Sequence, residues 1–174
     1  ERVPAYICYM TPEVTFWGTR GSIPTSGPEF AASGGDTSCV LVGLKDHVLI
    51  LDAGTGIRRA GLSLKDDTRD IILVLSHPHW DHIQGFPFFT PLYQEDRRIT
   101  VVAPGHPHWL DILTAQIDGV RFPVSCDFLS CTLERSSDLN GVLRAAGVAA
   151  TQINTNHAGD GLGYRFTIDG RSLV

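Results

Sequence analysis

Short apolar runs separated by turn residues dominate the chain and predict a structure with more strand than helix. The run at 71–75 is apolar without alternation and lies between polar residues, which is typical of a strand buried on both faces. Lys45-Asp46-His47 is expected to join two strands as a turn, and Asp169-Gly170 to open a hairpin whose second arm is 171–174. The full set of expected strands covers residues 14–17, 39–44, 48–51, 71–75, 99–103, 148–153 and 162–168.

Helical periodicity is present in two segments. Residues 57–64 are expected to form a short helix, and the apolar spacing from Trp109 through Leu113 to Ile117 predicts an amphipathic helix over 107–117. Because strands and helices are mixed along the chain, the predicted class is α/β or α+β with a large sheet content. A chain of 174 residues is long enough for one domain with its own core.

Composition restricts the classes of function. The net charge of −5 at pH 7, from 14 Lys+Arg against 19 Asp+Glu, gives no sign of an extended nucleic-acid surface. The cysteines (Cys8, Cys39, Cys126 and Cys131) include no CxxC pair, so we expect reduced thiols in a cytoplasmic protein. No apolar run is long enough for a signal peptide or a membrane span, and no contact with a membrane is expected.

The chemistry is concentrated in the segment Ser76-His77-Pro78-His79-Trp80-Asp81-His82, directly after the buried run. His77 and His79 are two residues apart, so in an extended chain they project to the same side and could grip one metal ion. Asp81 and His82 are adjacent and suit a second ion nearby. Imidazoles with a carboxylate favour zinc, iron or manganese. The alternative is a polar loop of solvated histidines, but three of the seven histidines stand here beside an aspartate.

The pattern His77-x-His79-x-Asp81-His82 resembles the HxHxDH signature of the metallo-β-lactamase-fold hydrolases. Segments at 16–22, 34–39 and 51–56, together with Asn156-His157, are similar to the branch that holds RNase Z-like and cyclic-phosphate phosphodiesterase-like members. The resemblance implies an αββα sandwich with the site at one edge of its sheets. It extends over residues 14–174, which leaves 1–13 as an N-terminal extension.

The resemblance also implies roles for individual residues. It places His77, His79 and His157 on a first metal ion, and Asp81 and His82 on a second. Asp81 would be a ligand first and a proton shuttle second. Asp52, at the end of its strand, would support the site by orienting a ligand; the alternative is an ordinary turn residue before Gly54.

Two glycine-rich loops are candidates for binding phosphate through their N–H groups. The candidate residues are Gly18, Thr19 and Arg20 in the first loop and Thr37 and Ser38 in the second. Plain turn chemistry is an equal alternative for both loops. The cations closest to matched motifs are Arg20 and Arg165, and each could equally be structural.

The chain departs from the family at several positions. It carries Asp36 where the branch has Asn, Ala158 where it has Pro, and an extra acidic residue at Asp160, which would repel a phosphodiester. Family members have a metal-bridging aspartate and a later histidine, and this sequence reaches Val174 before either. We therefore expect the domain to be truncated at its C-terminus relative to a longer family member.

The predicted function is a metal-dependent hydrolase, specifically a phosphodiesterase that uses two zinc ions, with manganese or iron as alternatives, and a metal-activated hydroxide. The expected substrate is a small phosphodiester or cyclic phosphate, because no basic arm for docking tRNA is found. A homodimer is one option for its assembly. Three alternatives stay open: a hydrolase of another ester, thioester, lactone or lactam, an iron-binding redox module, and a non-catalytic metal-binding fragment.

Overall fold

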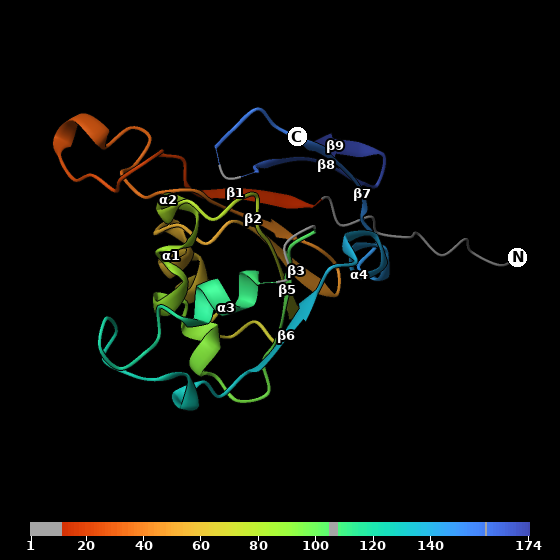
Figure 1. Ribbon diagram of the computed structural model, residues 1–174. Helices are drawn as coiled ribbons and strands as arrows, with labels where there is room; N and C mark the ends of the chain where they lie inside the picture. Colours follow the sequence, from red (N-terminus) through yellow and green to blue (C-terminus); the bar gives the residue numbers. More distant parts are fainter. Residues whose placement is uncertain (1–11, 105–107, 159) are drawn as a thin grey trace, which may run out of the picture.

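The computed structural model describes residues 12–104, 108–158 and 160–174 (Figure 1). Most of the expected N-terminal extension lies outside these residues, and the first strand already begins at Glu13. Among the residues that the structure describes, every helix is too short or too polar to span a bilayer.

A six-stranded mixed sheet forms the centre of the molecule (Figure 1). Its first three strands pair antiparallel, and from β3 onward each neighbouring pair is parallel. The spatial order follows the sequence: β1 (Glu13–Gly18), β2 (Cys39–Gly43), β3 (His47–Leu51), β4 (Asp70–Val74), β5 (Arg98–Val102) and β6 (Thr132–Ser136).

A second sheet of three antiparallel strands contains β7 (Ala149–Asn154), β8 (Leu162–Ile168) and β9 (Arg171–Leu173). The β8–β9 turn has positive φ at Asp169 (48°) and Gly170 (75°), which is the backbone of a two-residue hairpin with a type I′ turn. The predicted hairpin is thus confirmed.

The helices are short: α1 (Gly56–Ser63), α2 (Trp80–Ile83), α3 (Trp109–Thr114) and α4 (Leu139–Ala145). Single 3-10 turns lie at Pro28–Phe30, Phe86–Phe88, Thr90–Tyr93 and Cys126–Phe128. Leu139 and Leu143 are the buried residues of α4. Asp138 caps the N-terminus of this helix by accepting a hydrogen bond from the Gly141 N–H at 2.8 Å.

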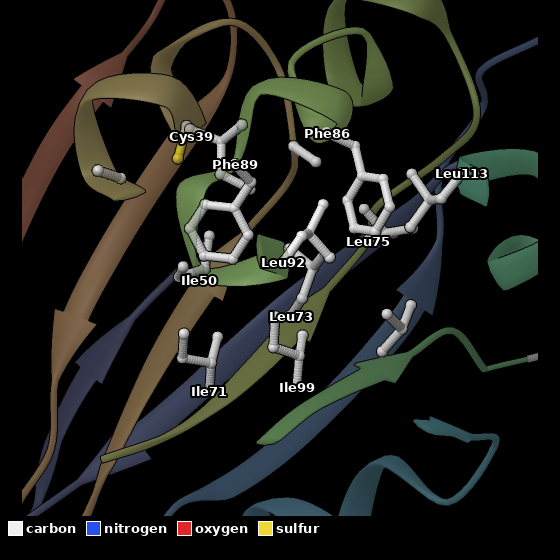
Figure 2. Close-up of a cluster of buried hydrophobic side chains, with 14 of the residues drawn as sticks. Cys39, Ile50, Ile71, Leu73, Leu75, Phe86, Phe89, Leu92, Ile99 and Leu113 are labelled. Atoms are coloured by element: carbon white, nitrogen blue, oxygen red, sulfur yellow. The ribbon is translucent and has the colours of Figure 1, made fainter. Parts of the chain in front are cut away.

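The central strands of the large sheet are buried on both faces, and the described residues form a hydrophobic cluster on each face. Ile71 and Leu73 of β4 point to the side of α1, α2 and α3, where they pack with Phe86 and Phe89 (Figure 2). Ile72 points the opposite way, into a cluster shared with α4 and the second sheet. Alternate residues of one apolar strand therefore serve two cores, as the run at 71–75 predicted. These layers, helices on a sheet on a second sheet, match three of the four layers of the predicted αββα sandwich.

Several elements differ from the sequence expectation. The helix predicted over 107–117 is limited to Trp109–Thr114, and residues 105–107 lie outside the described residues. His47 begins β3 instead of lying within the turn. β6 and α4 were not predicted at all. β6 extends the large sheet at one edge, whereas α4 packs on the face opposite α1 and α3, together with the second sheet.

The fold brings one later segment beside the histidine-rich segment. The backbone N–H of Leu162, at the start of β8, donates to the Ser76 carbonyl at 3.0 Å. The Tyr164 hydroxyl donates to the Leu75 carbonyl at 2.9 Å. These two bonds dock the start of β8 on the end of β4, and the loop between β7 and β8 therefore lies against residues 76–82.

Candidate metal centre

Three histidines converge at the carboxyl end of β4. The Nε2 atom of His157, in the β7–β8 loop, lies 3.1 Å from Nε2 of His77 and 3.2 Å from Nδ1 of His79. The ligand atoms of all three lie within 4.8 Å of one another. His77 and His79 project to the same side, with ring centroids 4.6 Å apart, as an extended segment requires.

Asp81 and His82 form a pair beside the three histidines. Both lie in α2, and the His82 ring centroid is 4.0 Å from that of His77. The Asp81 Oδ2 atom is 3.4 Å from Nε2 of His82 and accepts a hydrogen bond from the Ser22 N–H at 2.8 Å. Among the described residues, only the three histidines form a group of three or more candidate ligands. A second ion site at Asp81 and His82 stays a prediction.

Asp52 lies beneath both groups. It follows β3, is 7% exposed, and has a left-handed backbone with φ of 62°, which an aspartate tolerates better than most residues. Its carboxylate accepts hydrogen bonds from the Ser76 N–H (2.8 Å) and hydroxyl (2.9 Å), and from the Ser38 hydroxyl (3.2 Å). The carboxylate also lies 2.7 Å from Nδ1 of His82. The contact with His82 places Asp52 against a candidate ligand, and its role in orienting that ligand stays a prediction.

Burial and neighbouring charges shift the pKa values of His77 and His82 in opposite directions. Burial, and then the nearby His82, lower the pKa of His77 to about 4, so its ring is neutral at pH 7 and offers a lone pair. Burial also lowers the pKa of His82, but the hydrogen bond to Asp52 and the charges of Asp52 and Asp81 outweigh it, and the net pKa is raised.

Asp81 is held in its ionised form. Burial raises the pKa of Asp81, but the hydrogen bond from the Ser22 N–H and the charge of His82 lower it by more. The net pKa therefore lies below the ordinary value. A neutral imidazole at His77 and an ionised carboxylate at Asp81 are the protonation states that metal ligands need.

In the first candidate phosphate loop, the N–H donors of Thr19 and Arg20 form hydrogen bonds with other parts of the chain. The N–H groups of Thr19 and Arg20 both donate to the Asp36 carbonyl at 3.1 Å. The Arg20 Nε donates to the Ile23 carbonyl at 3.0 Å, and its guanidinium lies 4.7 Å from the centre of the Phe30 ring. These contacts favour the turn alternative for Thr19 and Arg20.

The second loop is fixed in the same way. Thr37 is fully buried, its N–H donates to the Thr55 hydroxyl at 2.9 Å, and its own hydroxyl accepts the Thr55 N–H at 2.8 Å. Ser38 donates to Asp52 instead of facing outward. At Gly18 a Cβ atom would meet the Thr37 carbonyl oxygen at 1.9 Å, so this glycine is needed for the two loops to pack. A phosphate role for these residues stays a prediction.

Sequence reasoning assigned no role to Ser22 or Ser76. Both contact residues that are distant in sequence. Ser22 contacts Asp81, which is 59 positions away, and Ser76 contacts Asp52, which is 24 positions away. The one available signal was position: Ser76 directly precedes the first histidine of the motif, where the strand has just ended.

Comparison with known proteins identifies the family of the chain. Residues 32–118 match the family model described as the metallo-beta-lactamase superfamily. Ribonuclease Z of Clostridium novyi is 25% identical over 175 residues, which cover 90% of this chain and 50% of that protein. The chain therefore spans about half the length of this curated relative.

Solved structures share the fold at low identity. The metallo-beta-lactamase fold protein YhfI from Bacillus subtilis matches with a TM-score of 0.63 and 19% identity, over 93% of this chain and 60% of that one. The short form of human tRNase Z matches with a TM-score of 0.60 and 16% identity, over 93% of this chain and 66% of that one. At these identities the likeness concerns the fold.

Proposed function

Because the chain belongs to the metallo-beta-lactamase superfamily, we propose that it forms the metal-binding part of a hydrolase that acts on phosphodiesters. The observation that carries this proposal is the convergence of His77, His79 and His157, with Asp81 and His82 beside them. A cluster of three imidazoles, of which His77 is buried and His157 exposed, at the carboxyl end of a parallel strand suits a metal ion better than it suits a structural core.

The residues present fit a metal ion. The Nδ1 atom of His77 lies 3.0 Å from the Ser76 hydroxyl, so Nε2 is the ring nitrogen left to face His157. In the proposal His77 and His157 offer Nε2 and His79 offers Nδ1 to a first ion, while Asp81 and His82 contribute to a second. Imidazole and carboxylate donors favour zinc, with manganese and iron as the closest alternatives.

When bound, divalent ions at this site would polarise a phosphoryl oxygen and make water a nucleophile near neutral pH. The chain's own residues hold and orient them. Asp52 fixes the ring of His82, and the Ser22 N–H fixes Asp81. Because Asp81 is ionised at neutral pH, it can act as a ligand and, after substrate has bound, take up a proton.

The substrate class follows from the relatives and from charge. The Clostridium relative carries the name ribonuclease Z, which indicates phosphodiester chemistry. A net charge of −5 disfavours a broadly basic surface of the kind that binds a folded nucleic acid. We therefore propose a small phosphodiester or a cyclic phosphate as the substrate, and a cytoplasmic location in keeping with the free thiols of Cys39, Cys126 and Cys131.

The test combines metal content with turnover. Elemental mass spectrometry of the purified protein should find zinc or manganese, and bis(p-nitrophenyl) phosphate should be hydrolysed. His77→Ala should lose both properties. His108→Ala is the matched control, because that side chain is 79% exposed and pairs only with its neighbour Asp111 in the described part of the chain. Unchanged metal content in His77→Ala would overturn the site, and turnover of thioesters, lactones or β-lactams alone would overturn the substrate class.

A further inference from the structure

The hydroxyl of Ser76 touches three ionisable groups at once. Its Oγ atom lies 2.9 Å from each carboxylate oxygen of Asp52, 3.0 Å from Nδ1 of His77 and 3.3 Å from Nδ1 of His82. The Ser76 N–H also donates to Asp52, at 2.8 Å. A single side chain therefore connects the carboxylate beneath the site to a histidine of each candidate ion site.

Counting protons fixes the direction of these bonds. A serine hydroxyl has one hydrogen to donate and two lone pairs to accept with, whereas an ionised carboxylate can only accept. The Ser76 hydrogen must therefore go to Asp52, since lone pairs would otherwise face each other at 2.9 Å. The Ser76 oxygen is then an acceptor toward His77, whose Nδ1 must carry the ring proton.

The neighbouring histidine is fixed without an intermediary. The Nδ1 atom of His82 lies 2.7 Å from Oδ2 of Asp52, so it too must carry a proton, and the lone pair of the neutral ring is left on Nε2. That Nε2 atom is the one 3.4 Å from Asp81. In both rings the nitrogen turned away from Asp52 is the one that faces the candidate ion.

We propose that Ser76 is a positioning residue that extends the orienting effect of Asp52 to the three-histidine site. Asp52 sets the tautomer of His82 directly and that of His77 through the Ser76 hydroxyl. One carboxylate thereby presents the ligand atoms of both candidate ion sites. This inference rests on the proposed metal site for its consequence, but its first step, the tautomer of His77, is a property of the metal-free protein.

The chain offers a matched control. Ser38 donates its hydroxyl to the same Asp52 carboxylate, at 3.2 Å, but its hydroxyl has no hydrogen bond to a histidine among those of the described residues. Ser76→Ala should weaken metal binding about 10- to 100-fold, the usual effect of removing a group that orients a ligand. Ser38→Ala should leave the affinity within about twofold, and Ser76→Thr, which keeps a hydroxyl at Cβ, should restore it.

Two measurements test the proposal without any substrate. Competition with a chromophoric chelator gives the metal affinity of each variant. Ring-nitrogen NMR of the metal-free protein at pH 7.5 gives the tautomer of His77, expected as Nδ1–H in the wild type and in Ser38→Ala. In Ser76→Ala the Nε2–H form should become populated.

A wild-type His77 in the Nε2–H form would overturn the proposal, and this measurement needs no variant to fold. Equal loss of affinity in Ser76→Ala and Ser38→Ala would also overturn it, because the effect would then be a general disturbance of Asp52. A protein that shows the expected tautomers but binds no metal would support the positioning role of Ser76 and instead refute the proposed function.

Discussion

Replacing Asp52 with asparagine should disturb the metal centre without disturbing the backbone. Asparagine is nearly isosteric with aspartate and equally tolerant of the left-handed conformation at this position, where φ is 62°. The amide keeps one oxygen and puts two N–H donors where the other oxygen stood. The Ser76 N–H approaches Oδ1 and Nδ1 of His82 approaches Oδ2, so in either orientation the new amide N–H group meets another donor.

The magnitude follows from the contacts that are lost. A hydrogen bond to a charged group contributes about 1.5–3 kcal/mol, so the free energy of unfolding of metal-free Asp52→Asn should fall by about that amount. If the amide instead donates to Nδ1 of His82, the ring proton moves to Nε2, the atom that would bind the ion. Metal affinity should then fall about 10- to 100-fold, which corresponds to about 1.4–2.8 kcal/mol.

Urea unfolding of the metal-free protein and a chelator-competition titration measure the two effects separately. Asp36→Asn is the control, because it removes the same charge from a carboxylate that accepts from the Thr55 hydroxyl at 3.0 Å and contacts no candidate ligand among the described residues. The control should keep wild-type metal affinity. An affinity for Asp52→Asn within about twofold of wild type, with the fold intact, would refute the orienting role of Asp52.

Three further predictions concern the frame around the site. Tyr164→Phe should lower the free energy of unfolding by about 1 kcal/mol, measured in urea, because the hydroxyl that docks β8 on the end of β4 is lost. Gly85→Ala should destabilise far more than Gly21→Ala in thermal melts, since a Cβ would lie 2.0 Å from a backbone oxygen at the first site and meets nothing at the second; equal melting temperatures would contradict this. Because the pKa of His77 is about 4 in the folded protein, its contribution should lower the stability of the metal-free protein as the pH falls from 6.5 toward 4. The pKa of His82 is raised, so its contribution stabilises the fold at low pH and is lost as the pH rises through its folded-state pKa. NMR titration of the two rings should therefore show His82 protonating above 6.5 and His77 well below it.

Strands with continuous or alternating apolar residues could be predicted from the sequence, and helices with little apolar periodicity could not. The run at 71–75 identified β4 because burial on both faces leaves no polar position. β6 (Thr132–Ser136) was missed because it lies at the edge of the sheet and none of its residues is fully buried. α4 was missed although its Asp138 cap is a usable signal, since only Leu139 and Leu143 mark its buried side.

At the site, the residue types were more predictable than their connections. Spacing alone placed His77 and His79 on one side, and the resemblance to known hydrolases supplied His157 and Asp52. The contacts of Ser22 and Ser76 depend on how loops meet after folding, and no local pattern encodes a hydrogen bond across 59 or 24 residues. Within the second predicted phosphate loop, Thr37 and Ser38 look free in sequence but have internal hydrogen-bond partners in the fold.

The separation of His77 and His157 along the chain has a mechanical consequence. These residues are 80 positions apart and belong to segments that leave different sheets. An ion held by both would act as a removable cross-link between the sheets, and for a covalent cross-link that closes a loop of this length the lost chain entropy is about 4–5 kcal/mol. Loading and stripping the ion would therefore tighten and loosen the packing of the small sheet on the large one. Amide exchange in β7 and β8 would then report the metal content of the protein as directly as elemental analysis does.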